Sequence, residues 1–356
     1  MNQQRLQKVL DNMKQAGLHQ LLVTETEPVY YLTGIWVSPM ERMMALYIRE
    51  DGKVTFFGNK LFAIAPQEGL EMVEHTDSDD PVAQLAAAVL PGELGIDETW
   101  PSRFLIGLMS HRPDVKPVLG SEPVAQATMY KDEEERELMR AASRIDDACI
   151  DMAIHAIREG ITEKELSSKV EHFFQEKGCD HLGFSIVAMG ANGADPHHGT
   201  DGTVLKEGDS IVMDIGAPFN HYWCDMTRTV FYKSASEEQR TVYEMVRRAN
   251  EAAIAVVKPG VAFKEIDLAA RKVIEDAGYG EYFTHRTGHS IGMKEHEQPP
   301  VSSECEVIAK PGMIFSIEPG IYLPGKFGVR VEDLVLVTED GCEVLNKYPK
   351  DLIVVE

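Results

Sequence analysis

The order of hydrophobic and polar positions divides the chain into two parts. Along the first part, short apolar runs such as LLVT, ALYIRE, KVTFFG and LGID alternate with helical stretches, including an amphipathic one at 1–17 and another at 81–90. This alternation predicts a small α/β domain, which we place at residues 1–127. The segment HRPDVKPVLGSEPV near its end holds three prolines and little periodicity, which predicts a linker.

The second part repeats one pattern. Gly160 and Gly260 each open an amphipathic helical stretch that ends in a glycine, and the strands EGDSIVMDIG and PGMIFSIEPG follow them. A carboxylate stands at the same place in both strands. The repetition predicts a duplicated helix-and-hairpin unit in a second domain at 128–356, whose first helix begins at Asp132 with an acidic turn. The two domains together give an α+β fold class.

Each predicted hairpin brings two carboxylates face to face, if its turn lies at 219–220 in the first and is centred on Gly325 in the second. The opposed pairs are Asp214 with Asp225 and Glu318 with Glu332. Opposed side chains are ~5 Å apart, and like charges there are destabilising. One pair could share a proton as an acid/base dyad, but two matched pairs in apolar strands favour bound cations.

Four carboxylates and one imidazole would suit two divalent metal ions, which activate water and polarise a carbonyl in hydrolytic sites. An oxygen-rich set with one histidine favours Mn²⁺, with Co²⁺ or Zn²⁺ as alternatives.

The stretch THRTGHSIGM could supply either a nucleophile or the missing imidazole. It contains the G-x-S-x-G pattern of serine hydrolases around Ser290, and also His285 and His289. A nucleophile elbow requires a buried strand before the serine and a later acid followed by a histidine. The preceding GEYFTHRT is too polar for such a strand, and no histidine follows His296. We therefore exclude Ser290 as a nucleophile and predict that His289 is a metal ligand.

Composition excludes several classes of partner. Hydrophobic residues form 44% and charged residues 26% of the 356-residue chain, as in ordinary globular proteins. The formal net charge of −23 argues against nucleic acid or an anionic membrane surface as a partner. The chain start lacks signal-peptide features, and no apolar run approaches the ~20 residues of a membrane span. Five scattered cysteines without a C-x-x-C pair predict reduced thiols in a cytoplasmic protein.

The motifs VMDIG, CDMTRT, HRTGHSIG, SIEPGIY and GVRVEDLVLV, at their spacing, resemble the pita-bread metallopeptidases, the family of prolidase, aminopeptidase P, methionine aminopeptidase and creatinase. The resemblance covers nearly the whole chain. In the first domain it rests on YYLTGI at 30–35 and the α/β pattern, which resemble the creatinase-like domain of this family. The resemblance implies a pita-bread catalytic domain in the second part.

The resemblance also implies roles for particular residues. Asp214 would bind one metal, Asp225 and Glu332 would bridge both metals, and His289 and Glu318 would complete the other site. Glu318 would also act as the general base. His197, in ADPHHGTD, and His296, in KEHE, would contact the substrate and take part in catalysis. Arg330 resembles a family arginine that would bind either the substrate or the carboxylates that hold the metals. His285 would contact the metal ligands without binding metal itself.

The implied activity is hydrolysis of the bond between an N-terminal residue and proline, by an Xaa-Pro dipeptidase or aminopeptidase that acts as a homodimer on proline-containing di- or oligopeptides. The alternatives are a catalytically silent binding module and a creatinase-like enzyme that acts on a non-peptide C–N bond. The intact ligand set favours the peptidase.

Substrate length is a separate question. Prolidases restricted to dipeptides use a cation for the free carboxylate, usually an arginine between the second substrate histidine and the glutamate ligand. The interval 297–317 contains no arginine. The sequence therefore predicts weak discrimination against longer Xaa-Pro peptides.

Overall fold

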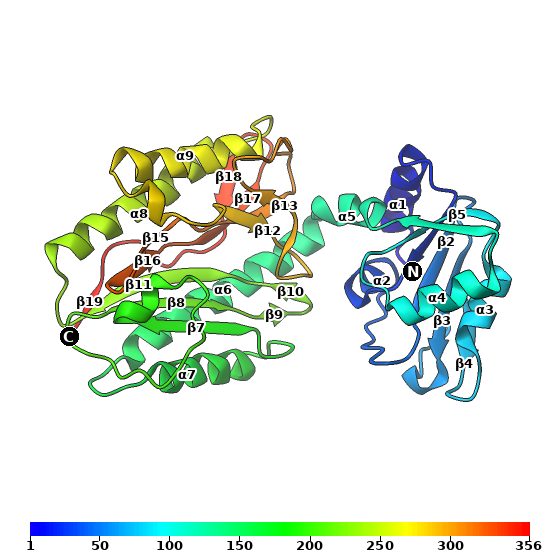
Figure 1. The fold of residues 1–356 in the computed structure, drawn as a ribbon, viewed down its shortest axis with the longest axis horizontal. Helices are drawn as coiled ribbons and strands as arrows, with labels where there is room; N and C mark the ends of the chain where they lie inside the picture. The colour runs from blue at the N-terminus through cyan, green and yellow to red at the C-terminus, as the bar shows by residue number, and fades with distance from the viewer. The chain divides into compact units, whose positions relative to one another are not determined.

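The computed structural model describes residues 1–356, which form two compact units, Met1–Thr128 and Met129–Glu356 (Figure 1). Each unit has a core of its own, and the larger unit has two. The mixture of helices and sheets confirms the α+β fold class. No helix is both long enough and apolar enough to cross a membrane. All five cysteines are unpaired.

The smaller unit is built around one six-stranded sheet with the order β4-β3-β2-β1-β5-β6. Its strands are β1 (Gln20–Val23), β2 (Ala45–Arg49), β3 (Val54–Asn59), β4 (Glu71–His75), β5 (Gly92–Ile96) and β6 (Val115–Leu119). Its helices are α1 (Gln3–Gln15), α2 (Thr26–Thr33), α3 (Pro81–Ala88), α4 (Ser102–His111) and α5 (Glu122–Met129). The apolar runs identified in the sequence form β1, β2, β3 and β5, so the predicted α/β pattern is confirmed.

The linker predicted before residue 125 is wrong, because this segment contains β6 and the start of α5. Val115 pairs with Gly92 in a parallel ladder at the edge of the sheet. Pro117 has no N–H to donate, and an edge strand tolerates this. The half-exposed edge position also explains why the segment lacks a clear apolar period.

The larger unit contains two helix pairs with strands between them (Figure 1). The helices are α6 (Glu133–Ala156), α7 (Glu163–Glu176), α8 (Glu237–Val256) and α9 (Phe263–Asp276). One sheet has the order β19-β11-β8-β7, formed by β7 (Phe184–Met189), β8 (Ser210–Gly216), β11 (Met226–Tyr232) and β19 (Val354–Val355). The other has the order β13-β12-β14-β17-β18, formed by β12 (Gly288–Ser290), β13 (Glu297–Val301), β14 (Ile314–Ile317), β17 (Asp333–Val337) and β18 (Cys342–Val344). Two small ribbons extend these sheets: β9 (Pro218–Phe219) with β10 (Tyr222–Trp223), and β15 (Gly320–Leu323) with β16 (Phe327–Arg330).

The duplication predicted from the sequence is visible in this unit. Each half has a helix pair followed by an antiparallel hairpin, and each second helix is preceded by the same isolated bridge, Thr162 with Val204 and Ala262 with Ile308. Asp132 caps α6 with a capping box, which confirms the predicted helix start.

The register predicted for the first hairpin is wrong by two residues. Asp214 pairs with Thr227 rather than with Asp225. The turn lies at Asn220 and His221, whose φ angles of 49° and 69° are those of a tight hairpin turn. Because side chains alternate with a period of two, a two-residue shift leaves Asp214 and Asp225 on the same face of the ribbon.

The register predicted for the second hairpin is confirmed. Gly320 pairs with Arg330, and Ile317 pairs with Asp333. Glu318 and Glu332 lie between these two ladders and therefore face each other. The turn is centred on Gly325, whose φ of 71° favours glycine.

A buried ion pair joins the two halves next to these carboxylates. The Arg228 guanidinium donates to Asp333 Oδ1 at 2.7 Å and to the Glu332 carbonyl at 2.5 Å, while Lys350 Nζ donates to Asp333 Oδ2 at 2.8 Å. Burial alone would raise the pKa of Asp333, but Arg228 and Lys350 hold it below its ordinary value. The pair thus fixes the backbone of β11 against that of β17.

We predict that Arg228→Met destabilises the larger unit by about 3–5 kcal/mol, because it leaves the Asp333 carboxylate buried with only one counter-charge. Arg247 on α8 forms ion pairs with Glu244 and Glu251 near the surface. Arg247→Met is the matched control and should cost less than about 1 kcal/mol. Urea unfolding of both variants measures the two losses of unfolding free energy. Equal losses would contradict the role given to the Arg228–Asp333 ion pair.

Candidate active site

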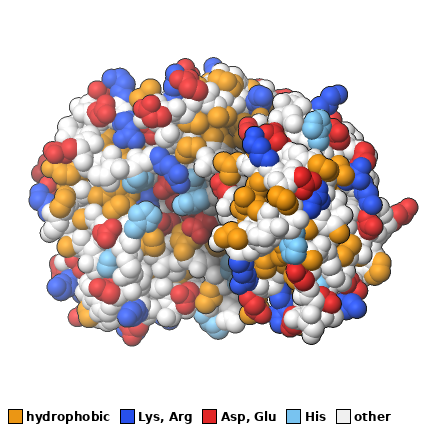
Figure 2. Space-filling model, turned by 45° about the vertical axis from the view of Figure 1, so that its right-hand side comes forward, with side chains coloured by type: hydrophobic (Ala, Val, Ile, Leu, Met, Phe, Trp, Pro, Cys, Tyr) orange, Lys and Arg blue, Asp and Glu red, His pale blue; other side chains and the backbone are white.

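A cavity of about 420 Å³ lies among the strand ends of the larger unit. Figure 2 shows histidine and acidic side chains gathered in a hollow of the visible face. The cavity is lined by Phe184, Ile186, Pro196, His197, Asp214, Asp225, His285, Arg286, His289, Glu295, His296, Glu318, Arg330 and Glu332. Every site residue predicted from the sequence is among them.

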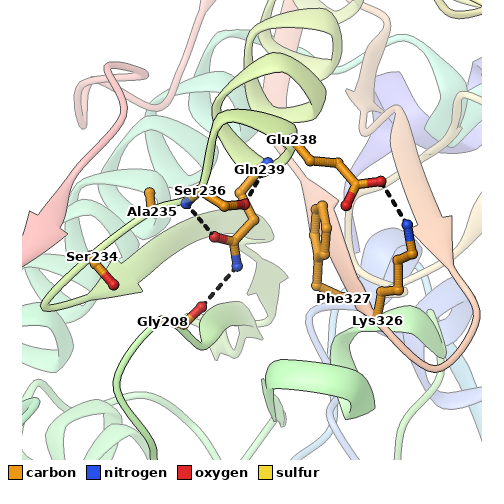
Figure 3. A pocket seen from close by; sticks show the side chains of 8 residues that line it. All are labelled: Gly208, Ser234, Ala235, Ser236, Glu238, Gln239, Lys326 and Phe327. Carbon is orange, nitrogen blue, oxygen red and sulfur yellow. Dashed lines mark hydrogen bonds and ion pairs between the residues drawn. The ribbon is translucent and has the colours of Figure 1, made fainter.

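A second cavity of similar volume lies at the start of α8 (Figure 3). Its charged side chains pair with each other, since Lys326 Nζ donates to Glu238 Oε1 at 2.7 Å. The Gln239 side chain donates to the Gly208 carbonyl at 2.8 Å. Because these polar groups already have partners within the protein, we assign the candidate active site to the first cavity.

The five predicted ligands lie on five different strands or directly beside them. Asp214 lies on β8 and His289 on β12, Glu318 directly follows β14, and Asp225 and Glu332 directly precede β11 and β17. His289 Nε2 lies 3.4 Å from Asp225 Oδ2 and 3.5 Å from Glu318 Oε1. One ligand atom each of Asp225, His289 and Glu332 lies within 4.8 Å of the others. This spacing suits a shared cation.

The negative charge of the carboxylates is compensated only in part, by Arg330 on Asp214. Burial, and then the neighbouring Asp214, raises the pKa of Asp225 well above its ordinary value. Burial and the charge of Asp225 do the same for the pKa of Glu332. Asp214 Oδ1, Asp225 Oδ1 and Glu332 Oε1 are buried without a hydrogen-bond partner. Buried oxygens of this kind fit the coordination of a divalent metal ion.

Arg330 is buried beside the carboxylates. Its guanidinium donates to Asp214 Oδ2 at 2.5 Å, to Tyr322 Oη at 2.8 Å and to Thr227 Oγ1 at 3.0 Å. Thr227 Oγ1 in turn donates to Glu332 Oε2 at 2.7 Å. Arg330 therefore orients a carboxylate of each half, directly in one case and through Thr227 in the other.

His285 lies behind this arginine. Its Nε2 lies 2.8 Å from Tyr322 Oη and its Nδ1 lies 2.7 Å from the Arg286 carbonyl, so neither nitrogen is turned to the carboxylates. Burial and the charge of Arg330 lower the pKa of His285 to about 4. Burial also raises the pKa of Tyr322 to about 12. Both side chains are thus neutral at ordinary pH and complete the hydrogen bonding of Arg330.

The other two predicted histidines face the open part of the cavity. The His296 ring lies 3.9 Å from that of His289, centroid to centroid, and burial with the charge of His289 lowers the pKa of His296 to about 4. His197 lines the opposite loop, where its backbone N–H donates to Asp195 Oδ1 at 3.0 Å. Ser290 is buried and its Oγ donates to the Pro299 carbonyl at 2.8 Å, away from the cavity lining.

The loop that carries His197 is fastened by Glu163, a buried residue that sequence reasoning missed. Its carboxylate accepts from Met189 N at 2.7 Å, Asn192 Nδ2 at 2.9 Å and Asp201 N at 3.0 Å, and lies 2.8 Å from His198 Nε2. Glu163, His198 and Asp201 are close enough to hold a metal ion. Because four donors already surround the carboxylate, its evident function is to fix the loop.

Arg286 and Glu295 also line the cavity and were missed. Both lie in the stretch that holds His285, His289 and His296, so their charge was readable there. The sequence does not show that these two side chains point into the cavity, because their direction depends on how the loop packs.

Comparisons with known proteins agree with this geometry. Residues 5–128 match the Creatinase/Prolidase N-terminal domain, and residues 137–339 match metallopeptidase family M24.

Solved structures similar to this chain include three with related names. A dipeptidase from Pyrococcus horikoshii is 35% identical, with a TM-score of 0.94, and the match covers 98% of this chain and 99% of that one. A prolidase from Thermococcus sibiricus is 34% identical with a TM-score of 0.94, covering 99% of both chains. An X-Pro aminopeptidase from Thermotoga maritima is 29% identical with a TM-score of 0.83, covering 97% of this chain and 100% of that one.

Proposed function

The chain belongs to metallopeptidase family M24, and we propose that it hydrolyses the bond between an N-terminal residue and proline with two divalent metal ions. The observation that carries the proposal is the buried group of four carboxylates with His289, whose ligand atoms converge without enough cations to balance them. The names of the similar structures, dipeptidase, prolidase and X-Pro aminopeptidase, support an N-terminal bond next to proline.

The residues present fit a two-metal site. Asp214 would hold one ion, His289 and Glu318 would hold the other, and Asp225 and Glu332 would contribute to holding both. The donor set of carboxylate oxygens and one imidazole favours Mn²⁺, with Co²⁺ or Zn²⁺ as alternatives. When bound, such ions polarise the scissile carbonyl and lower the pKa of the attacking water.

The protein side chains supply the remaining steps. Glu318 accepts the proton of the attacking water and is held by Ser316 Oγ, which donates to its Oε1 at 3.2 Å. His296 stabilises the negative charge that develops on the carbonyl oxygen, and His197 holds the substrate near the departing proline nitrogen. Arg330 orients Asp214 rather than binding substrate, because four of its five N–H groups already have protein partners.

A silent binding module and a creatinase-like enzyme acting on a non-peptide C–N bond are the other candidates. All five ligands converge in this cavity, which favours a working metal enzyme over a module that has lost its site. The peptidase names of the similar structures favour a peptide bond.

A hydrolysis panel tests the proposal. We predict that the purified protein supplied with Mn²⁺, Co²⁺ or Zn²⁺ cleaves Ala-Pro and Leu-Pro, with the highest rate in Mn²⁺, and cleaves Ala-Leu less well. Amino-acid release measures each rate. No cleavage of any Xaa-Pro substrate with metal bound would contradict the proposal.

Two variants separate the metal site from the serine motif. Asp225→Asn removes a ligand charge and should lower kcat by at least about 1000-fold, since the ions provide several kcal/mol of transition-state stabilisation. Ser290→Ala should retain most of the activity. Circular dichroism and metal content are measured in parallel, because an unfolded Asp225→Asn protein would make this residue structural instead.

Metal removal should make stability depend on pH in a specific direction. Burial raises the pKa of Asp225 and Glu332, so the metal-free folded protein keeps protons that the unfolded chain has lost. The contribution of these two groups to the free energy of unfolding is therefore fully present at low pH and is lost as pH rises through their folded-state pKa. Metal ions bind the ionised form, so the Tm gained on adding Mn²⁺ should be larger at about pH 8 than at about pH 5.

A calorimetric scan with and without Mn²⁺ at each pH measures this gain, and titrating groups whose pKa is the same with and without the metal cancel in the difference. At about 1000 times Kd the gain is about 4 kcal/mol, or roughly 10 °C for a unit of this size. A gain at pH 5 equal to that at pH 8 would show that these carboxylates do not bind the metal.

We also propose a homodimer, on the family resemblance, and a cytoplasmic location, since the five cysteines are unpaired. Light scattering at micromolar concentration should give twice the 39.7 kDa mass of one chain. A single-chain mass would refute the dimer, and recovery of the protein outside the cytoplasmic fraction would refute the location.

A further inference from the structure

A buried lysine is paired with the loop that carries His296. Lys131 comes two residues before α6, and its side chain is only 2% exposed. Its Nζ donates to Glu297 Oε2 at 2.7 Å, and the Glu297 side chain is 11% exposed. Neither residue lines the active-site cavity, whereas His296, which directly precedes Glu297, does. The ion pair therefore holds the loop from outside the cavity, one residue away from a cavity side chain.

The backbone of Lys131 is itself fixed. Its N–H donates to the Gly312 carbonyl at 2.9 Å, and its carbonyl accepts from Arg136 Nε at 2.9 Å. The next residue, Asp132, forms the capping box of α6 with Glu135. The cation is thus attached to the start of a 24-residue helix and to the segment before β14.

The ion pair also packs closely against the backbone of the loop. Glu297 Oε1 accepts from Lys294 N at 3.4 Å, so one carboxylate joins the lysine to the loop backbone. A Cβ atom added at Gly292 would lie 2.6 Å from Glu297 Oε1 and 2.9 Å from Lys131 Cε. Both distances are shorter than van der Waals contact, so glycine is required for this close approach.

Stability alone is a weak reason for such a pair. The free energy needed to remove both charges from water is about as large as their attraction, and apolar residues of similar size often give equal stability. An ion pair of fixed geometry does determine where Glu297 lies, and with it the position of His296. The His296 ring lies 3.9 Å from that of His289, centroid to centroid, so a small shift of the loop would change its position relative to this predicted metal ligand.

We propose that Lys131, through Glu297, positions His296 to stabilise the charge that develops on the carbonyl oxygen. This inference rests on the proposed function and adds a positioning residue to it. Misplacement of a catalytic group by about 1 Å can lower turnover by about 100-fold. Because His296 is assigned to the transition state, its misplacement should lower kcat rather than raise KM.

A double-mutant cycle with Ala-Pro as substrate and Mn²⁺ as the metal tests the proposal. Lys131→Met removes the charge but keeps a long side chain, and should lower kcat by about 10- to 100-fold with KM nearly unchanged. In a protein that already carries His296→Ala, the same substitution should have little further effect, because both changes remove one interaction. Lys131→Arg keeps the charge and should retain more activity than Lys131→Met.

Arg140 provides the matched control. It lies on α6, and its Nη2 donates to Glu343 Oε2 at 2.8 Å, outside the cavity lining. Arg140→Met should keep the wild-type kcat. If Lys131→Met does not fold, Glu297→Gln takes its place in the cycle. A wild-type kcat in Lys131→Met, or an equal loss with and without His296, would overturn the proposal.

Nuclear magnetic resonance of the histidine rings gives a readout without turnover, in protein supplied with Zn²⁺. The signal of His296 is the one lost in His296→Ala. It should shift in Lys131→Met and stay in place in Arg140→Met, and an unshifted signal in Lys131→Met would also overturn the proposal. If no Xaa-Pro substrate is cleaved, the proposed function fails, while this comparison still decides whether Lys131 fixes the His296 ring.

Discussion

The larger unit must hold four buried carboxylates within a few ångströms of one another. Burial and mutual repulsion raise the pKa of Asp225 and Glu332, and several of the oxygens have no hydrogen-bond partner. Such a group is unfavourable by itself and becomes favourable only with cations. Arg330 provides one charge, on Asp214, and the remainder fits divalent metal ions. The site and its cofactor requirement therefore follow from the same electrostatic constraint.

The duplicated fold is what keeps the carboxylates together against that repulsion. Each half contributes a hairpin, and the hairpins meet where Glu332 N donates to the Thr227 carbonyl and Thr227 Oγ1 donates to the Glu332 carboxylate. The buried pair of Arg228 with Asp333 fixes the same junction one residue further along both strands. Because the proposed metal ligands lie on or next to strands held by these bonds, their positions do not depend on flexible loops.

The side of the cavity that holds His197 and Arg286 is built differently, from loops that buried carboxylates hold in place. Glu163 fastens the loop of His197, and Asp267 fastens the backbone next to Arg286. In both loops the backbone is held by a carboxylate outside the cavity lining, so the side chains that line the cavity remain available to a ligand. The cavity thus combines a carboxylate group held by strands with polar side chains on loops whose backbone is fixed.

The sequence by itself determined the features that local interactions control. The start of α6 follows from the capping box at Asp132, and the register of the second hairpin follows from the turn at Gly325. The motif spacing also named the five residues that converge in the cavity. Only the tertiary structure decided the first register, where Asn220 and His221 adopt positive φ, and the strand pairing of β6. The tertiary structure also decided the surroundings of the two arginines. Arg330 donates to Asp214, 116 residues away in the chain, and Arg286 lines the cavity without a bound side chain. The physical reason is that packing between distant segments, and not the neighbours in the chain, sets the direction of a side chain.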